Sequence, residues 1–122
     1  MTVVTRRKTL IILNDPPYGT ERSYNGLRLA NALSKGEGDE VRVFLIGDAV
    51  ACGKGRQKTP DGFYNLERMF KVAARQGATV GACGSCLDAR GIGEEELADG
   101  VNRSSMEELT SWTRWADKVV VF

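Results

Sequence analysis

The chain has 122 residues, which favours a single domain over residues 1–122 that buries its own core without disulfides. Its 17 Lys and Arg balance 16 Asp and Glu, and this net charge of +1 gives no reason to expect direct binding to nucleic acid or to an anionic membrane. No apolar run is long enough to span a bilayer, and the first ten residues are too weakly apolar for a signal peptide, so we expect a soluble cytoplasmic protein.

The first half of the chain contains two continuous apolar runs that predict buried strands, Lys8–Asp15 and Glu40–Gly47. Between them, a helix is expected to begin at Thr20 or Glu21 and to end near Lys35. Runs of this kind are typical of parallel sheets, in which both faces of a strand are covered.

The second half repeats this alternation. Asn65 is a plausible N-cap and Gly77 a plausible C-cap for one helix, and Ser104 with Glu107 forms a capping-box pattern for another. The predicted elements are a helix at 65–77, a strand at 78–83, a helix at 104–116 and a strand at 118–122. Strands that alternate with helices predict an α/β domain with a parallel sheet.

Three segments follow the predicted strands, and ligand sites in open α/β sheets form beyond the carboxyl ends of strands. They are the loop "NDPPYG", the long irregular segment Gly47–Tyr64 and the stretch "CGSCLDARG". Either they line one crevice or their arrangement is chance. The candidate site residues in these segments are Asp15, Tyr18, Cys52, Lys54, Cys83, Cys86 and Arg90.

Cys83 is the strongest candidate for a reactive thiol. It stands at a strand end before an expected helix, with Ser85 and Asp88 as an N-cap pair and Arg90 on the following turn. Unpaired N–H groups and a nearby cation favour the thiolate, which is the nucleophilic form of cysteine. The alternative is that Cys83 is a small buried hydrophobe.

Cys86 follows one helical turn later, so the pair resembles a redox C-x-x-C motif. The alternative is that Cys86 is a buried side chain that only fills space in the core. The chain has 3 Cys and no His. An odd number of cysteines indicates reduced thiols, and the absence of histidine excludes a Cys–His pair. Three thiols cannot complete a four-ligand zinc site, so no metal is expected.

The segment after Gly47 nearly reads as a phosphate-binding P-loop, but its spacing is wrong and Gly55 stands where Ser or Thr is needed. The nearby cations Lys54, Arg56 and Lys58 belong to a solvated loop, or they form an anion contact near Cys52 or a docking surface for an acidic partner. On the last predicted helix, Trp112 and Trp115 are interpreted as residues of the core or of a subunit interface.

Three blocks of the sequence, "LNDPPYGTERSYNGLRLANAL", "GDAVACGKGRQKTPDGFYNLERM" and "CGSCLDARGI", resemble the DsrE/DsrF-like family, in particular its YchN-like branch. The resemblance runs from about residue 8 to the end of the chain. It implies a flavodoxin-like, three-layer α/β domain with a mainly parallel sheet of four or five strands. It also implies homo-oligomers, commonly trimers or hexamers.

Well-understood members of this family carry sulfur as a cysteine persulfide between donor and acceptor proteins. Their acceptor cysteine precedes an Arg-Gly by seven residues, as Cys83 precedes Arg90 here. The resemblance therefore implies a sulfur carrier or sulfurtransferase that loads Cys83, with Cys86 and Cys52 matching cysteines of the YchN-like branch. Such chemistry needs no cofactor. A thiol–disulfide redox protein and a non-catalytic oligomeric subunit remain the alternatives.

Overall fold

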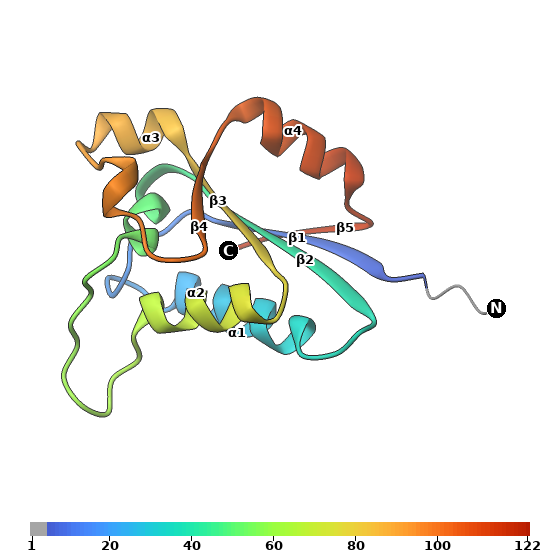
Figure 1. The fold of residues 1–122 in the computed structure, drawn as a ribbon, viewed down its shortest axis with the longest axis horizontal. Coiled ribbons are helices and arrows are strands. Elements are labelled where there is room, and N and C mark those ends of the chain that lie inside the picture. The colour runs from blue at the N-terminus through green and yellow to red at the C-terminus, as the bar shows by residue number, and fades with distance from the viewer. Residues whose placement is uncertain (1–4) are drawn as a thin grey trace.

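The computed structural model describes residues 5–122, so the first four residues of the stretch assessed above for a signal peptide lie outside the described residues (Figure 1). Among residues 5–122, five strands form one sheet in the order β4-β3-β2-β1-β5, and every neighbouring pair is parallel. The strands are β1 (Arg7–Leu13), β2 (Asp39–Leu45), β3 (Thr79–Cys83), β4 (Val101–Ser104) and β5 (Lys118–Val121).

The helices cover both faces of the sheet and complete three layers. They are α1 (Arg22–Ser34), α2 (Leu66–Arg75), α3 (Gly84–Ala89) and α4 (Met106–Trp115), with two short 3₁₀ helices, η1 (Gly47–Gly53) and η2 (Glu94–Glu96). The helices α1 and α2 lie on one face and α4 lies on the other (Figure 1). The expected flavodoxin-like α/β fold is thus confirmed. Within residues 5–122, no helix combines the length and apolar character needed to cross a bilayer.

The core is built around the central strands. Leu10, Ile11 and Leu13 of β1 are fully buried, as expected for a strand covered on both faces. On the α4 side, Trp112 meets Phe44 edge to face with ring centroids 6.1 Å apart. Trp112 is therefore a core residue of the monomer, and of its two predicted locations the subunit interface is wrong.

Two helix starts were predicted with different success. Asn65 is the N-cap of α2, since its side chain accepts a hydrogen bond from the Arg68 amide. The N-cap of α4, however, is Ser105, which accepts from the Glu108 amide, rather than Ser104. The shift arises because Ser104 ends β4, a strand that the sequence did not predict.

The segment Gly47–Tyr64 is less irregular than expected. Its first seven residues form η1, in which the apolar side chains of Val50 and Cys52 are fully buried against the core. Reading the whole segment as a loop was wrong for this part, because burial of those side chains fixes the chain as a 3₁₀ helix. The irregular connection is limited to residues 54–64.

Because all five strands are parallel, their carboxyl ends meet at one edge of the sheet. Cys83 ends β3 at this edge and pairs in register with Ser104, the last residue of β4. The helices η1 and α3 begin just beyond it, after β2 and β3. The fold therefore places the predicted reactive cysteine where the backbone leaves the sheet.

Candidate functional site

Cys83 occupies the junction between β3 and α3. It is the residue immediately before the helix and is 5% exposed, so its surroundings are largely protein. Its Sγ lies 3.4 Å from the hydroxyl oxygen of Ser85. The predicted capping pair is wrong: Cys83 itself holds the N-cap position without a side-chain cap, and Ser85 lies inside the helix.

The two thiols of the C-G-S-C stretch differ in acidity. Burial alone raises the pKa of Cys83, but hydrogen bonds from the side chains of Cys86 and Ser85 and from their amides outweigh it, and the pKa lies below that of an ordinary cysteine. Burial raises the pKa of Cys86, and its hydrogen bond with Cys83 raises it further. Cys83 is thus the more acidic thiol of the pair and Cys86 the less acidic one.

Cys86 is held by the start of η1 and by the end of its own helix. The Gly47 amide donates to the Cys86 Sγ at 3.3 Å, and Arg90 donates to the Cys86 carbonyl at 3.1 Å. Arg90 also pairs with Asp48 at 2.7 Å. We expected Arg90 to supply positive charge to Cys83, but the structure places its ion pair beside Cys86 instead.

A cation that was not among the predicted site residues lies against the Cys83 turn, the turn formed by Cys83 and Gly84. Arg103 of β4 packs its guanidinium over Gly84, so closely that a Cβ built on Gly84 would come within 2.8 Å of the Arg103 Cζ. Two parallel hydrogen bonds of 2.9 Å join this guanidinium to Asp88. The only local signal was the glycine directly after Cys83, since glycine often marks a close approach of another group.

Cys52 belongs to a different cluster. It is fully buried, and its Sγ donates to the Asp15 carbonyl at 3.3 Å. Burial raises the pKa of Cys52 to about 12. The Tyr18 hydroxyl is hydrogen-bonded to Gln57, whose amide in turn donates to the Cys52 carbonyl at 2.7 Å.

The structure therefore divides the predicted site residues into two groups at the same edge of the sheet. Asp15, Tyr18 and Cys52 come together through the β1 loop and η1. Cys83 and Cys86 come together in the first turn of α3. Both groups follow strand ends, but the contacts do not bring all three thiols into one shared crevice.

Lys54 lies in neither group. It pairs with Glu96 at 3.5 Å and lines a groove of about 940 Å³ between η1 and η2. The groove also holds Arg56, but four carboxylate side chains line it too: Glu67, Glu95, Glu96 and Asp99. The predicted anion contact near Cys52 is therefore weakened by nearby negative charge.

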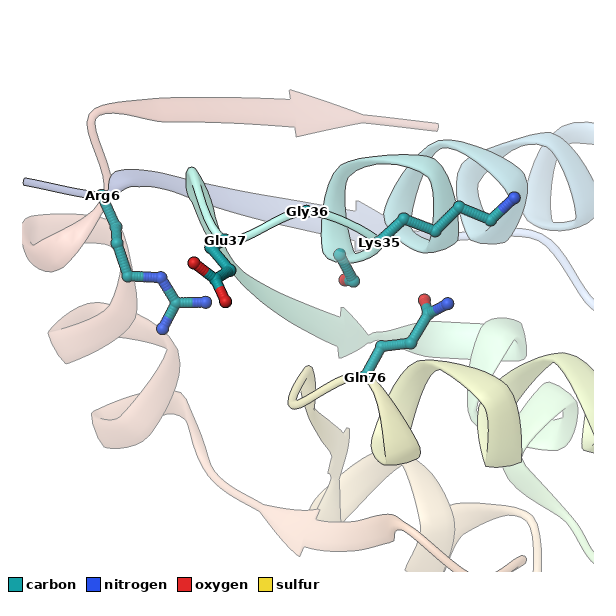
Figure 2. A pocket seen from close by; sticks show the side chains of 6 residues that line it. Arg6, Lys35, Gly36, Glu37 and Gln76 are labelled. Atoms are coloured by element: carbon teal, nitrogen blue, oxygen red, sulfur yellow. The ribbon is translucent and has the colours of Figure 1, made fainter. Parts of the chain in front are cut away.

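A second hollow lies far from these residues in the fold. This pocket has a volume of about 530 Å³. Arg6, Lys35, Glu37 and Gln76 are among the residues that line it (Figure 2). Arg6 precedes β1 and Glu37 precedes β2, so this pocket lies at the amino ends of the strands, opposite the cysteines. Among residues 5–122, no group of three or more Cys, Asp or Glu is arranged to hold a metal ion.

The three cysteines are expected to respond to alkylation at different pH values. The labelling midpoint of Cys83 should lie below the roughly 8.5 of a free cysteine, because its thiolate is stabilised. Cys52 should stay unlabelled in the folded protein, since it is fully buried and its pKa is raised to about 12. Iodoacetamide labelling from pH 5 to pH 10, with each cysteine localised by tandem mass spectrometry, measures both. A Cys83 midpoint at or above that of free cysteine would contradict the assignment.

Comparison with known proteins gives consistent matches over nearly the whole chain. The family model described as "DsrE/DsrF-like family" matches residues 7–122. Protein YchN of Escherichia coli is 42% identical over 117 residues, covering 95% of this chain and 99% of that protein. Protein MK0008 of Methanopyrus kandleri is also 42% identical, over 92% of this chain and 91% of its own length.

Solved structures agree with these matches. The crystal structure of the Escherichia coli YchN protein superimposes with a TM-score of 0.89 over 95% of this chain and 99% of that chain. Protein MTH1491 of Methanobacterium thermoautotrophicum, at 14% identity, gives a TM-score of 0.73 over 95% of this chain and 99% of that chain. The latter likeness concerns the fold alone.

Proposed function

This chain belongs to the DsrE/DsrF-like family, and we propose that it is a sulfur carrier that accepts sulfur on Cys83 as a persulfide and passes it to a partner protein. The observation that carries the proposal is the position of Cys83. It ends a strand at the carboxyl edge of the sheet, with Ser85 and Cys86 hydrogen-bonded to its sulfur. Those bonds favour the nucleophilic thiolate.

The proposed loading step is an exchange at sulfur. The Cys83 thiolate attacks the outer sulfur of a persulfide on a donor protein, a new S–S bond forms at Cys83, and the old S–S bond breaks to release the donor thiolate. One thiolate is consumed and one is released, so no external oxidant or reductant is required. The donor and the acceptor are both proteins that present a cysteine.

The proposal is tested by incubating the reduced protein with a cysteine desulfurase and cysteine, removing both, and measuring the intact mass. A gain of one sulfur atom per chain supports the sulfur carrier. An unchanged mass, with no disulfide formed on mild oxidation, supports a non-catalytic subunit instead.

The contact between Cys83 and Cys86 favours a second candidate function, thiol–disulfide exchange. The two thiols lie within one helical turn and influence each other's titration, as in a C-x-x-C pair that can exchange with a disulfide. In the same mass measurement, loss of two hydrogens on mild oxidation without any sulfur gain would support this function and contradict sulfur loading.

We also propose that the protein acts as a homo-oligomer, most simply a trimer or hexamer. Phe63 is 70% exposed at the end of the irregular connection, and Val121 is 62% exposed on β5, an outer strand of the sheet. Exposed aromatic and apolar side chains of this size are typical of contact surfaces. Sedimentation equilibrium at micromolar concentration should give a multiple of the 13.3 kDa chain mass, and a mass near 13.3 kDa would contradict the prediction.

A further inference from the structure

We infer that Arg103 adds to the hydrogen bonds of Cys86 and Ser85 at the Cys83 site: its guanidinium, held over Gly84, stabilises negative charge on the Cys83 sulfur and on sulfur carried there. The part of this inference that concerns carried sulfur rests on the proposed function. The part that concerns the thiolate stands on the structure of the free protein alone.

The backbone brings Arg103 to this place. β4 pairs with β3 so that Arg103 lies opposite Ala82 and Ser104 lies opposite Cys83. The Arg103 side chain then reaches past the end of β3 and rests on Gly84, the first residue of α3. Any side chain at position 84 would occupy the space that the guanidinium fills, because the Cβ position lies 2.8 Å from Cζ and 2.9 Å from Nε.

Asp88 fixes the orientation of the guanidinium. Its two carboxylate oxygens accept one hydrogen bond each from the two terminal nitrogens of Arg103, both at 2.9 Å. The pair therefore links Asp88, near the end of the six-residue helix α3, to the guanidinium that rests on Gly84 at its start. The Arg103 Nε takes no part in that pair, and it lies 2.9 Å from the Cβ position of Gly84, next to Cys83.

Arg103 and Cys83 also influence each other electrostatically, less strongly than Asp88 influences Arg103. The pKa of Arg103 is raised first by its hydrogen bonds with Asp88 and the charge of that carboxylate, and the charge of Cys83 contributes in the same direction. A charged Cys83 therefore favours the charged guanidinium, and by reciprocity the guanidinium favours the thiolate.

Other polar and charged groups also surround the turn at Cys83. Cys86 donates a hydrogen bond to the Cys83 sulfur. Ser104, which pairs with Cys83 across the sheet, is hydrogen-bonded to Glu108 of α4. Glu94 lies close enough to Arg103 to raise its pKa. Asp48 and Arg90 form their own pair on the Cys86 side. Of these charges, the Arg103 guanidinium is the cation packed against the residue that follows Cys83.

The test compares five variants of the full-length, reduced protein by the pH dependence of iodoacetamide labelling at Cys83. Arg103→Gln removes the charge, and Arg103→Lys keeps it. Gly84→Ala keeps every charge but displaces the guanidinium, whose flexible side chain moves aside. Arg114→Gln, on the exposed end of α4, is the matched control for loss of one arginine.

Arg103→Gln and Gly84→Ala are both expected to raise the Cys83 labelling midpoint, with Arg103→Lys falling between wild type and Arg103→Gln. For each unit by which the Cys83 pKa rises, labelling at neutral pH should slow by about threefold. The fraction of thiolate falls about tenfold, but a thiolate of higher pKa is a better nucleophile and offsets part of that loss. Arg114→Gln should leave the midpoint unchanged. A second control, Gly36→Ala, introduces a methyl group where the nearest atom is 4.0 Å away and should also have no effect.

If the Cys83 labelling midpoint of Arg103→Gln equals that of the wild type, the inference is overturned. It is also overturned if Arg103→Lys and Arg103→Gln raise the midpoint equally, since the charge would then have no effect. If Arg103→Gln does not fold, an unchanged midpoint in Gly84→Ala overturns it in the same way. No sulfur donor is present in these measurements. Failure of wild-type protein to load sulfur would therefore refute the proposed function while leaving the result for Arg103 and the thiolate intact.

Discussion

Replacing Cys83 by serine is expected to reduce sulfur loading to background. A hydroxyl cannot form a persulfide, and serine fits the site because it is close to cysteine in size and can keep the hydrogen bond with the Ser85 hydroxyl. The remaining thiols do not compensate: Cys52 is fully buried, and the pKa of Cys86 is raised by burial and by its hydrogen bond with Cys83. Sulfur bound per chain after incubation with a cysteine desulfurase and cysteine is the measurement.

Cys52→Ser is the matched control, since it removes a thiol at the same edge of the sheet but from the other cluster. It should load sulfur as the wild type does. Equal loading of wild type and Cys83→Ser would rule out Cys83 as the acceptor, and loading that is lost only in Cys52→Ser would move the acceptor to the buried cluster.

Replacing Cys86 by serine should leave loading intact and slow the discharge of sulfur. In the proposed discharge step, the Cys86 thiolate attacks the inner sulfur of the Cys83 persulfide, the two cysteines form a disulfide, and the outer sulfur leaves as hydrosulfide. Because both cysteines lie in the first turn of α3, this step is intramolecular, and its loss is expected to slow sulfide release by at least about tenfold.

Sulfide release from loaded protein, freed of donor and kept without external thiol, measures this rate. The pH dependence has a definite sign: the pKa of Cys86 is raised by burial and by its hydrogen bond with Cys83, so wild-type release should speed up as pH rises from 7 to 9. Cys52→Ser should release sulfide at the wild-type rate. Unchanged release from Cys86→Ser would show that Cys86 takes no part in discharge.

Most of the fold could be predicted because the interior strands carry their own signal. Strands β1 and β2 are continuous apolar runs, and α2 begins at an asparagine whose side chain caps it. Strand β4 could not be found in this way. Its sequence "VNRS" is short and mostly polar, and it is a strand only because the edge of β3 offers hydrogen bonds.

The same difference between local sequence signals and tertiary contacts applies to the candidate site. Cys83 and Cys86 were predictable because their chemistry and their position after a strand are local features. The arginine was not: Arg90 is near Cys83 in sequence, yet it pairs with Asp48 beside Cys86. Arg103 lies against the Cys83 turn because β4 pairs with β3, a contact that no local pattern encodes.

The central claim is that sulfur is carried on Cys83, and the most direct measurement is its location in the wild-type protein. After exposure to the desulfurase and cysteine, the loaded protein is alkylated, digested and sequenced by tandem mass spectrometry. The peptide after Arg75 contains both Cys83 and Cys86, so fragment ions between them assign the extra sulfur. We expect an alkylated persulfide on Cys83 and an ordinary alkylated thiol on Cys86. Extra sulfur on Cys86 with none on Cys83, or no extra sulfur on either, would contradict the account.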